Sequence, residues 1–163
     1  MLLALWLGAA LLFSTVVAPT VFTVLRSFDL ANANEIAGTI VTRTLAIINV
    51  AGFLIGLLAV AMLVFLRSRI NAVTWIIELA SLAVLVVTTA LGQWVIAARM
   101  RALRASMVTI DLVSPADPRR IAFTDLHHYS VLLLGVAMIA AVVAIVVSVV
   151  SLRLGFKQRN QVA

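Results

Sequence analysis

The side chains with the greatest capacity for chemistry are two adjacent histidines, His127 and His128, the only histidines in the chain. Neighbouring side chains on a helix point about 100° apart, so they do not chelate one metal ion as an i, i+4 pair does. A haem held between histidines of two helices is excluded, because there is no third histidine. Two interpretations stay open: a structural role, or one haem or metal ligand completed by Asp29 or Glu35. We predict the structural role and no cofactor, with His127 as the alternative haem or metal ligand.

Three further polar residues lie in or beside long apolar runs, and a bilayer interior makes such groups candidates for function. Asn49 and Gln93 need hydrogen-bond partners away from lipid, either between helices or around a small polar cavity. Glu78 stands at the edge of a charge-free run and is within reach of Arg69 or Arg153. We predict that Glu78 forms an ion pair at the membrane interface, with a proton or cation site as the alternative.

No arrangement typical of an enzyme is present. The chain has no cysteine, which excludes disulfides, thiol nucleophiles and zinc sites built from cysteine. We find no pairing of a nucleophile with a base, no phosphate-binding loop and no nucleotide-binding fingerprint. The sequence therefore predicts a protein without enzymatic activity.

The composition places these residues in a membrane protein. Of 163 residues, 64% are hydrophobic and 11% are charged, whereas soluble domains are about 25% charged. Four runs lack charge, residues 1–25, 44–66, 79–98 and 129–152, and each has the roughly 20 residues that a helix needs to cross a bilayer. We predict an all-α integral membrane protein, a four-helix up-down-up-down transmembrane bundle.

The helices are expected to extend beyond the bilayer on one side. Residues 31–43 contain few helix breakers, and residues 99–111 place apolar side chains at helical spacing, which predicts a helix over both. Asp117 is expected to cap the last helix, with Pro118 at its first position. On the other side, residues 67–71 are predicted to form a tight turn. The whole chain, 1–163, is then one domain with spans of about 1–25, 44–66, 75–98 and 129–152.

The basic residues lie at the ends of the apolar runs, where lipid headgroups account for them, so we predict no nucleic-acid partner. An even number of spans places both termini on the same side as the 67–71 turn. That side has fewer basic residues but shorter segments, and no acid among them. We predict cytoplasmic termini in a bacterial inner membrane.

Small residues are expected where helices pack, since lipid does not drive helices together by exclusion of water. Gly52 and Gly56 form a GxxxG motif in the second span. In the fourth span, small residues recur at steps of three and four, including Ala141, Ala144 and Ser148. We predict packing within the chain at these positions, with a homo-oligomer or a larger membrane complex as the alternative.

Pro19 lies near the end of the first apolar run. Proline removes one backbone hydrogen bond and is expected to bend the helix. Ser14 and Thr15, one turn earlier, are expected to satisfy the carbonyl that proline leaves free.

Three groups of residues together resemble a family of small membrane proteins. The first group is VAPTVF at residues 17–22, and the second is AGTIV at residues 37–41 with Asn49 and Gly52. The third is FTDLHHYS at residues 123–130, at the entry to the fourth span. The chain is identified as similar to a bacterial domain-of-unknown-function family related to transmembrane protein 205. The family pattern has an Asn where this chain has Leu134.

The resemblance implies a four-helix membrane protein without an established enzymatic activity, and it selects Pro19, Phe22, His127 and Ser130 as one functional face. Helical rotation also places His127 and Ser130 on the same side of their helix. We therefore expect His127 to be buried against the end of the first helix, bonded to Thr20, Thr23 or Asn32. His128 is expected to face outward.

Three functions follow as hypotheses. The first is a membrane protein in contact with the lipid bilayer and without enzymatic activity, transporter-like for a small solute or metal, with a polar cavity that reaches Asn49 or Gln93. The second is an accessory subunit of a larger membrane complex. The third is haem or metal binding through His127.

Overall fold

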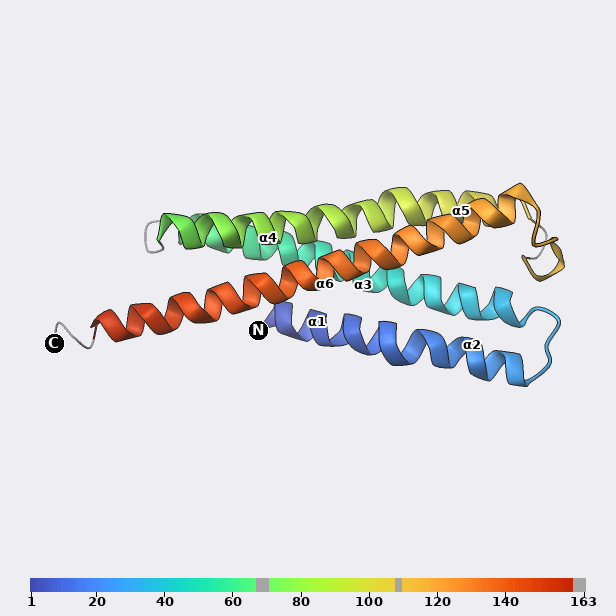
Figure 1. Ribbon diagram of the computed structural model, residues 1–163, viewed down its shortest axis with the longest axis horizontal. Coiled ribbons are helices and arrows are strands. Elements are labelled where there is room, and N and C mark those ends of the chain that lie inside the picture. The colour runs from blue at the N-terminus through green and yellow to red at the C-terminus, as the bar shows by residue number, and fades with distance from the viewer. Residues whose placement is uncertain (67–70, 108–109, 160–163) are drawn as a thin grey trace.

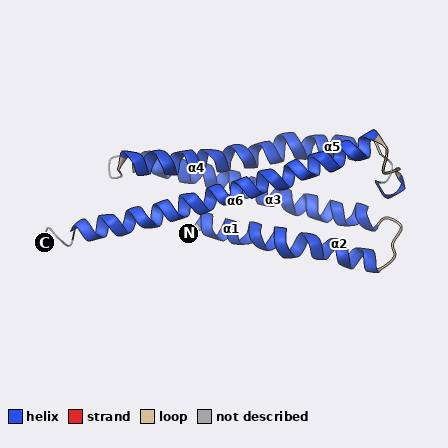
Figure 2. Cartoon of the chain, viewed as in Figure 1, coloured by secondary structure: helices blue, strands red, loops and turns tan. Residues whose placement is uncertain are grey.

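A computed structural model describes residues 1–66, 71–107 and 110–159, and no strand occurs among them. The all-α prediction is confirmed, and Figure 2 shows blue helices joined by tan loops, with no strand in the described part of the chain. The α-helices are α1 (Leu2–Leu12), α2 (Ala18–Ser27), α3 (Ala33–Phe65), α4 (Ala72–Ala90), α5 (Ala97–Ala105) and α6 (Pro118–Arg159). A π-helical segment, Phe13–Val17, joins α1 to α2, and another, Leu91–Ile96, joins α4 to α5.

These elements form four rods that run up and down beside one another (Figure 1). Each rod contains a stretch long and apolar enough to span a membrane: Leu2–Ser27, Ala33–Phe65, Ala72–Ala105 and Pro118–Ser151. The chain therefore has the character of an integral membrane protein.

The helix expected over residues 99–111 ends earlier than predicted, at Ala105. Ser106 turns back to donate its hydroxyl to the Leu103 carbonyl, and a short 3-10 helix, Ile110–Leu112, follows residues 108–109, which lie outside the described ranges. The prediction was wrong because Asp111, within that 3-10 helix, bonds to the start of α3 instead of continuing α5. Most of the predicted 67–71 turn also lies outside the described residues.

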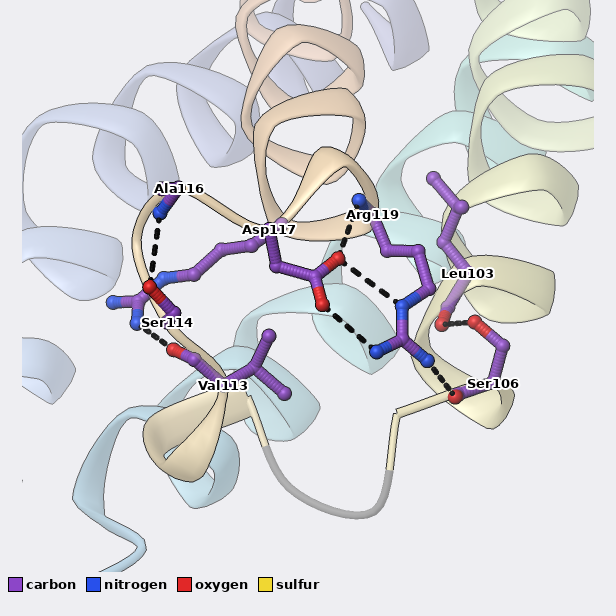
Figure 3. Close-up of polar contacts among 8 residues, drawn as sticks. Leu103, Ser106, Val113, Ser114, Ala116, Asp117 and Arg119 are labelled. Atoms are coloured by element: carbon purple, nitrogen blue, oxygen red, sulfur yellow. Dashed lines mark hydrogen bonds and ion pairs between the residues drawn. The ribbon is translucent and has the colours of Figure 1, made fainter.

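The start of α6 is held by Asp117, whose Oδ1 accepts from the Arg119 amide at 2.8 Å, as an N-cap does (Figure 3). The Arg119 guanidinium folds back on the same carboxylate and also donates to the Ser106 carbonyl at 2.8 Å. The predicted Asp117 cap is thus confirmed, and Arg119 ties the start of α6 to the end of α5.

The first rod passes Pro19 by widening into a π-helical turn, in which the Ala18 amide donates to the Phe13 carbonyl. Ser14 and Thr15 do not satisfy the carbonyl that Pro19 leaves free. Their hydroxyls bond to the carbonyls of Ala10 and Leu11, each at 2.8 Å. The carbonyl that Pro19 leaves free belongs to Thr15, four residues before it. That expectation was wrong because a serine or threonine hydroxyl on a helix bonds to the carbonyl one turn before it in the sequence, and therefore does not reach the Thr15 carbonyl.

Trp6 fixes how α1 packs on α3. Its indole Nε1 donates to the Ile48 carbonyl at 2.8 Å, and the side chain is 4% exposed. The ring lies over Gly52, where an added Cβ would stand 2.7 Å from it. Glycine at this position is what lets the indole reach the backbone of α3.

This contact shifts the first rod along the bundle. Trp6 lies level with the stretch from Ile48 to Gly52, and Arg26 bonds to Asn34 near the start of α3. The α2 helix thus packs beside the part of α3 that precedes its charge-free run. Figure 1 shows the result, with the N-terminus part-way along the bundle.

The second half of the core is the seam between α4 and α6, which pack closely along their length. Leu82 and Leu85 of α4 are 2% and 0% exposed, and they belong to one core cluster with small residues of α6. Those small residues are Ala137, Ala140, Ala141 and Ala144. Gly56 of α3 closes the core, because Val86 of α4 occupies the space that its Cβ would fill.

We expect Gly52→Ala to destabilise the bundle by roughly 1–3 kcal/mol, since the new methyl group collides with the Trp6 ring. Gly8→Ala is the matched control. Nothing lies within 4 Å of a Cβ at Gly8, so its stability should stay equal or rise slightly. Unfolding in mixed micelles with increasing SDS measures the stability of both variants. Equal losses in the two variants would contradict the packing of Trp6 on Gly52.

Asp117 supplies a test of the α6 cap. The Arg119 side chain and then its amide hold the pKa of Asp117 at about 2, below its usual 3.8. Because the folded pKa is depressed, the cap contributes stability above pH 3.8 that is lost as the pH falls toward 2. A carboxyl NMR titration should give this midpoint, and Arg119→Gln should raise it. An unchanged midpoint in that variant would show that Arg119 does not hold the carboxylate.

Candidate functional site

The densest group of polar contacts lies where the helices extend past the apolar runs, and Arg104 of α5 is at its centre. Arg104 Nε stands 3.1 Å from Glu35 Oε1, an ion pair without hydrogen-bond geometry, and Nη1 is 3.4 Å from the Thr39 hydroxyl. The guanidinium lies against Gly38, where a Cβ would collide with it. Phe123 of α6 covers it, with 5.7 Å from the ring centre to Cζ.

A second set of bonds joins this group to the loops. Asp111 accepts from the Asn34 amide side chain at 2.7 Å and from the Glu35 backbone amide at 3.2 Å. Asn34 in turn accepts from Arg26 Nε at 2.9 Å. An anion that binds the free amides of a helix start is stabilised there by the helix dipole. Asp111 therefore anchors the 110–112 segment to α3 and, through Asn34, to α2.

We call this set, Arg26, Asn34, Glu35, Thr39, Arg104 and Asp111, the loop-end network. It connects α2, α3, α5 and the 3-10 helix, with Phe123 of α6 above it. Sequence reasoning did not find it. The available signal was the charge of Arg104, Glu35 and Asp111 among small residues. Arg104 and Asp111 lie about 70 residues from Glu35 in the sequence, so only the fold brings them together.

His127 and His128 are both exposed in the chain. The expectation of a buried His127 was therefore wrong, and no described residue gives it the hydrogen bond expected from Thr20, Thr23 or Asn32. The reason is the packing at this end: α2 packs on α3, whereas the start of α6 packs on α5. Figure 1 shows α2 and α5 at opposite edges of the bundle.

The other residues of the proposed face are also dispersed. Pro19 is exposed, and Phe22 is half-buried with Arg26 Cζ 5.6 Å from its ring centre. Ser130 is 6% exposed, so it is the buried polar residue on this part of α6. α2, which carries Pro19 and Phe22, and α6, which carries His127 and Ser130, are not a closely packed pair, so no described contact joins these four residues into one site.

The polar residues within the spans lie at different places. Asn49 is 4% exposed, and its amide packs 3.3 Å from the Cβ position of Gly92 in the second π-helical segment. The neighbouring Gln93 has a buried Oε1 that accepts no hydrogen bond from a described residue. Gln93 therefore lies within the second π-helical segment, and Asn49 packs against the same segment from α3.

Glu78 is half-buried between α4 and α6, where it accepts a hydrogen bond from Ser148. Its proposed partners, Arg69 and the side chain of Arg153, lie outside the described part of the chain. Ser148 continues the small-residue seam of Ala141 and Ala144, which are 0% and 1% exposed. The bond to Glu78 makes Ser148 a polar contact as well as a packing residue.

Among the described residues, no group of three or more His, Cys, Asp or Glu side chains could hold a metal ion. His127 and His128 have ring centres 6.4 Å apart. Haem or metal binding through His127 stays a prediction.

Comparison with known proteins adds the family. A family model described as a domain of unknown function (DUF4149) matches residues 1–109. The chain belongs to this family. The matched part ends before α6, so it includes Trp6, Gly52 and Arg104 but neither histidine. No curated protein and no solved structure matches the chain.

The loop-end network predicts unequal effects for two arginines of α5. Arg104→Gln should destabilise the bundle by about 1–2 kcal/mol, since the partly buried pair with Glu35 loses its charge on one side. Arg101→Gln should change the stability of the bundle little, because Arg101 is exposed and has no described partner. A double-mutant cycle with Glu35→Gln, measured by unfolding in mixed micelles, gives the coupling. A coupling near zero would contradict the importance of the pair.

Proposed function

We propose that this chain is an accessory subunit of a larger membrane complex, without enzymatic activity of its own. The observation that carries the proposal is a contrast among glycines. Gly38, Gly52, Gly56 and Gly92 each receive a side chain from another helix, whereas no other described helix comes within 4 Å of a Cβ at Gly8 or Gly135. Open glycines on membrane helices allow another helix to approach closely.

The exposed histidines support the same proposal. His127 and His128 lie on α6, beside a charge-free run, and both are exposed. Polar groups near a bilayer are stabilised by partners or by headgroups. Gly8 and Gly135 lie on α1 and α6, which pack against each other, so one partner helix has access to both rods.

The transporter-like hypothesis rests on a different observation, the buried Gln93 Oε1 without a described partner. Together with Asn49 and a π-helical turn, a frequent feature of functional sites, it favours a small polar solute as the second candidate. That hypothesis needs a water-filled path to Gln93. Water accessibility of a cysteine at position 93, measured with a small membrane-impermeant thiol reagent, tests it.

The relationship to transmembrane protein 205 is part of this proposal. It rests on the motifs at residues 17–22, 37–41 and 123–130, of which the first two lie in the family match. We also propose a bacterial inner membrane with both termini in the cytoplasm. Labelling of single cysteines placed beside Arg101 and at the C-terminus would decide the orientation.

The subunit proposal predicts that Gly8→Ile or Gly135→Ile releases the chain from its complex. The added side chain keeps a neighbouring helix away while leaving the bundle intact, because the space around both glycines is open within the chain. Blue-native migration of native membranes in mild detergent should shift from a large species to a small one. Leu5→Ile is the control, since Leu5 is 71% exposed and already bulky.

A lone monomer or dimer for the unaltered protein, in several mild detergents, would refute the accessory-subunit proposal. So would a large species that survives both glycine substitutions unchanged.

A further inference from the structure

An open groove of about 630 Å³ lies between α5 and the start of α6. Arg99 and Asp125 contribute its charges, one from each helix. Leu103 and Leu126 form apolar walls, and small alanines leave the space between the helices open. The groove is thus mainly apolar, with one cation and one anion on opposite sides.

The groove lies at the level expected for lipid headgroups. Arg99 is the first charged residue after the charge-free run 79–98. The rise from Glu78 to Arg99 is roughly 30 Å of helix, which equals the hydrocarbon thickness of a bilayer. The remaining lining residues follow Arg99 outward as far as Ser106, where the bond from Arg119 to the Ser106 carbonyl joins the two walls.

The two charges of the groove have no partner among the described residues. No described residue forms an ion pair or a side-chain hydrogen bond with Arg99 or Asp125. In contrast, Arg104 is engaged with Glu35, and Arg119 with Asp117. Arg99 and Asp125 are therefore available for a ligand that carries both signs of charge.

We propose that this groove binds the headgroup of a phospholipid that carries a phosphate and a primary ammonium, as in phosphatidylethanolamine. The Arg99 guanidinium donates to the phosphate oxygens, and the ammonium donates to the Asp125 carboxylate. Leu103 and Leu126 contact the apolar part of the lipid next to the headgroup. Pockets between membrane helices that carry basic residues bind lipid headgroups by the same chemistry.

The charge pair also gives the headgroup preference. A choline headgroup has no N–H to donate to Asp125, and a glycerol headgroup has no cation to place beside it. The site lies on α5 and the first turns of α6, and neither Gly8 nor Gly135 of the proposed association surface lines it. It therefore goes beyond the accessory-subunit proposal and does not depend on it.

The test is native mass spectrometry of the full chain from vesicles of equal parts phosphatidylethanolamine, phosphatidylcholine and phosphatidylglycerol. We expect one phosphatidylethanolamine to stay bound in preference to the other two. Arg99→Gln should lower its retention about tenfold, the loss of one charge-assisted hydrogen bond. Asp125→Asn should remove the preference over phosphatidylcholine and keep phospholipid bound.

Arg101→Gln is the matched control, because Arg101 is exposed on the same helix but does not line the groove. An equal loss in Arg101→Gln and Arg99→Gln would overturn the proposal, since it would indicate general attraction of lipid to basic residues. Equal retention of all three lipids by the unaltered chain would overturn it as well. Should Arg99→Gln fail to fold, Asp125→Asn still decides, because the headgroup preference is measured within that one variant.

Discussion

The constraint on which the bundle depends is the close approach of helix backbones at glycine. Lipid does not drive apolar helices together, so contact area and hydrogen bonds must hold them. Four glycines accept a side chain from a neighbouring helix: Trp6 on Gly52, Val86 on Gly56, Asn49 on Gly92 and Arg104 on Gly38. One pair joins the first rod to the second, and the other three join the second and third rods at different depths, so together they fix the register of the first three rods. The fourth rod packs through the small residues of α6 instead.

The Trp6 contact has the largest consequence for the architecture. Its indole needs an acceptor because a buried N–H without one is costly, and the Ile48 carbonyl is reachable only across a glycine. This places α1 level with the middle of α3 and carries α2 past Arg43. The loop-end network follows from the same shift, since it brings Arg26 beside Asn34.

The class of protein, the four long helices and the Asp117 cap were predictable, because run length and local capping depend on residues close in sequence. The contacts of the candidate site were harder to predict from the sequence. Asp111 looked like the end of one helix, yet its partners are the amides at the start of another, 76 residues away. His127 was expected inside because the family resemblance and helical rotation placed it with Ser130 on a face toward the end of the first helix, whereas α2 packs on α3 and the start of α6 packs on α5. Neither register nor long-range pairing is encoded in a spacing pattern.

The distribution of satisfied hydroxyls also limits where chemistry can occur. Thr88 and Thr89 are buried in the middle of the bundle, but their hydroxyls bond to carbonyls of their own helix, as those of Ser14 and Thr15 do. Such groups are not free to bind a solute between helices. Within the described spans, the amide side chains of Asn49 and Gln93 and the buried hydroxyl of Ser130 are then the main polar groups left in the interior. Arg99 and Asp125, which have no partner in the described part of the chain, and the open glycines lie on the outside, which favours function through contacts with lipid and partner helices.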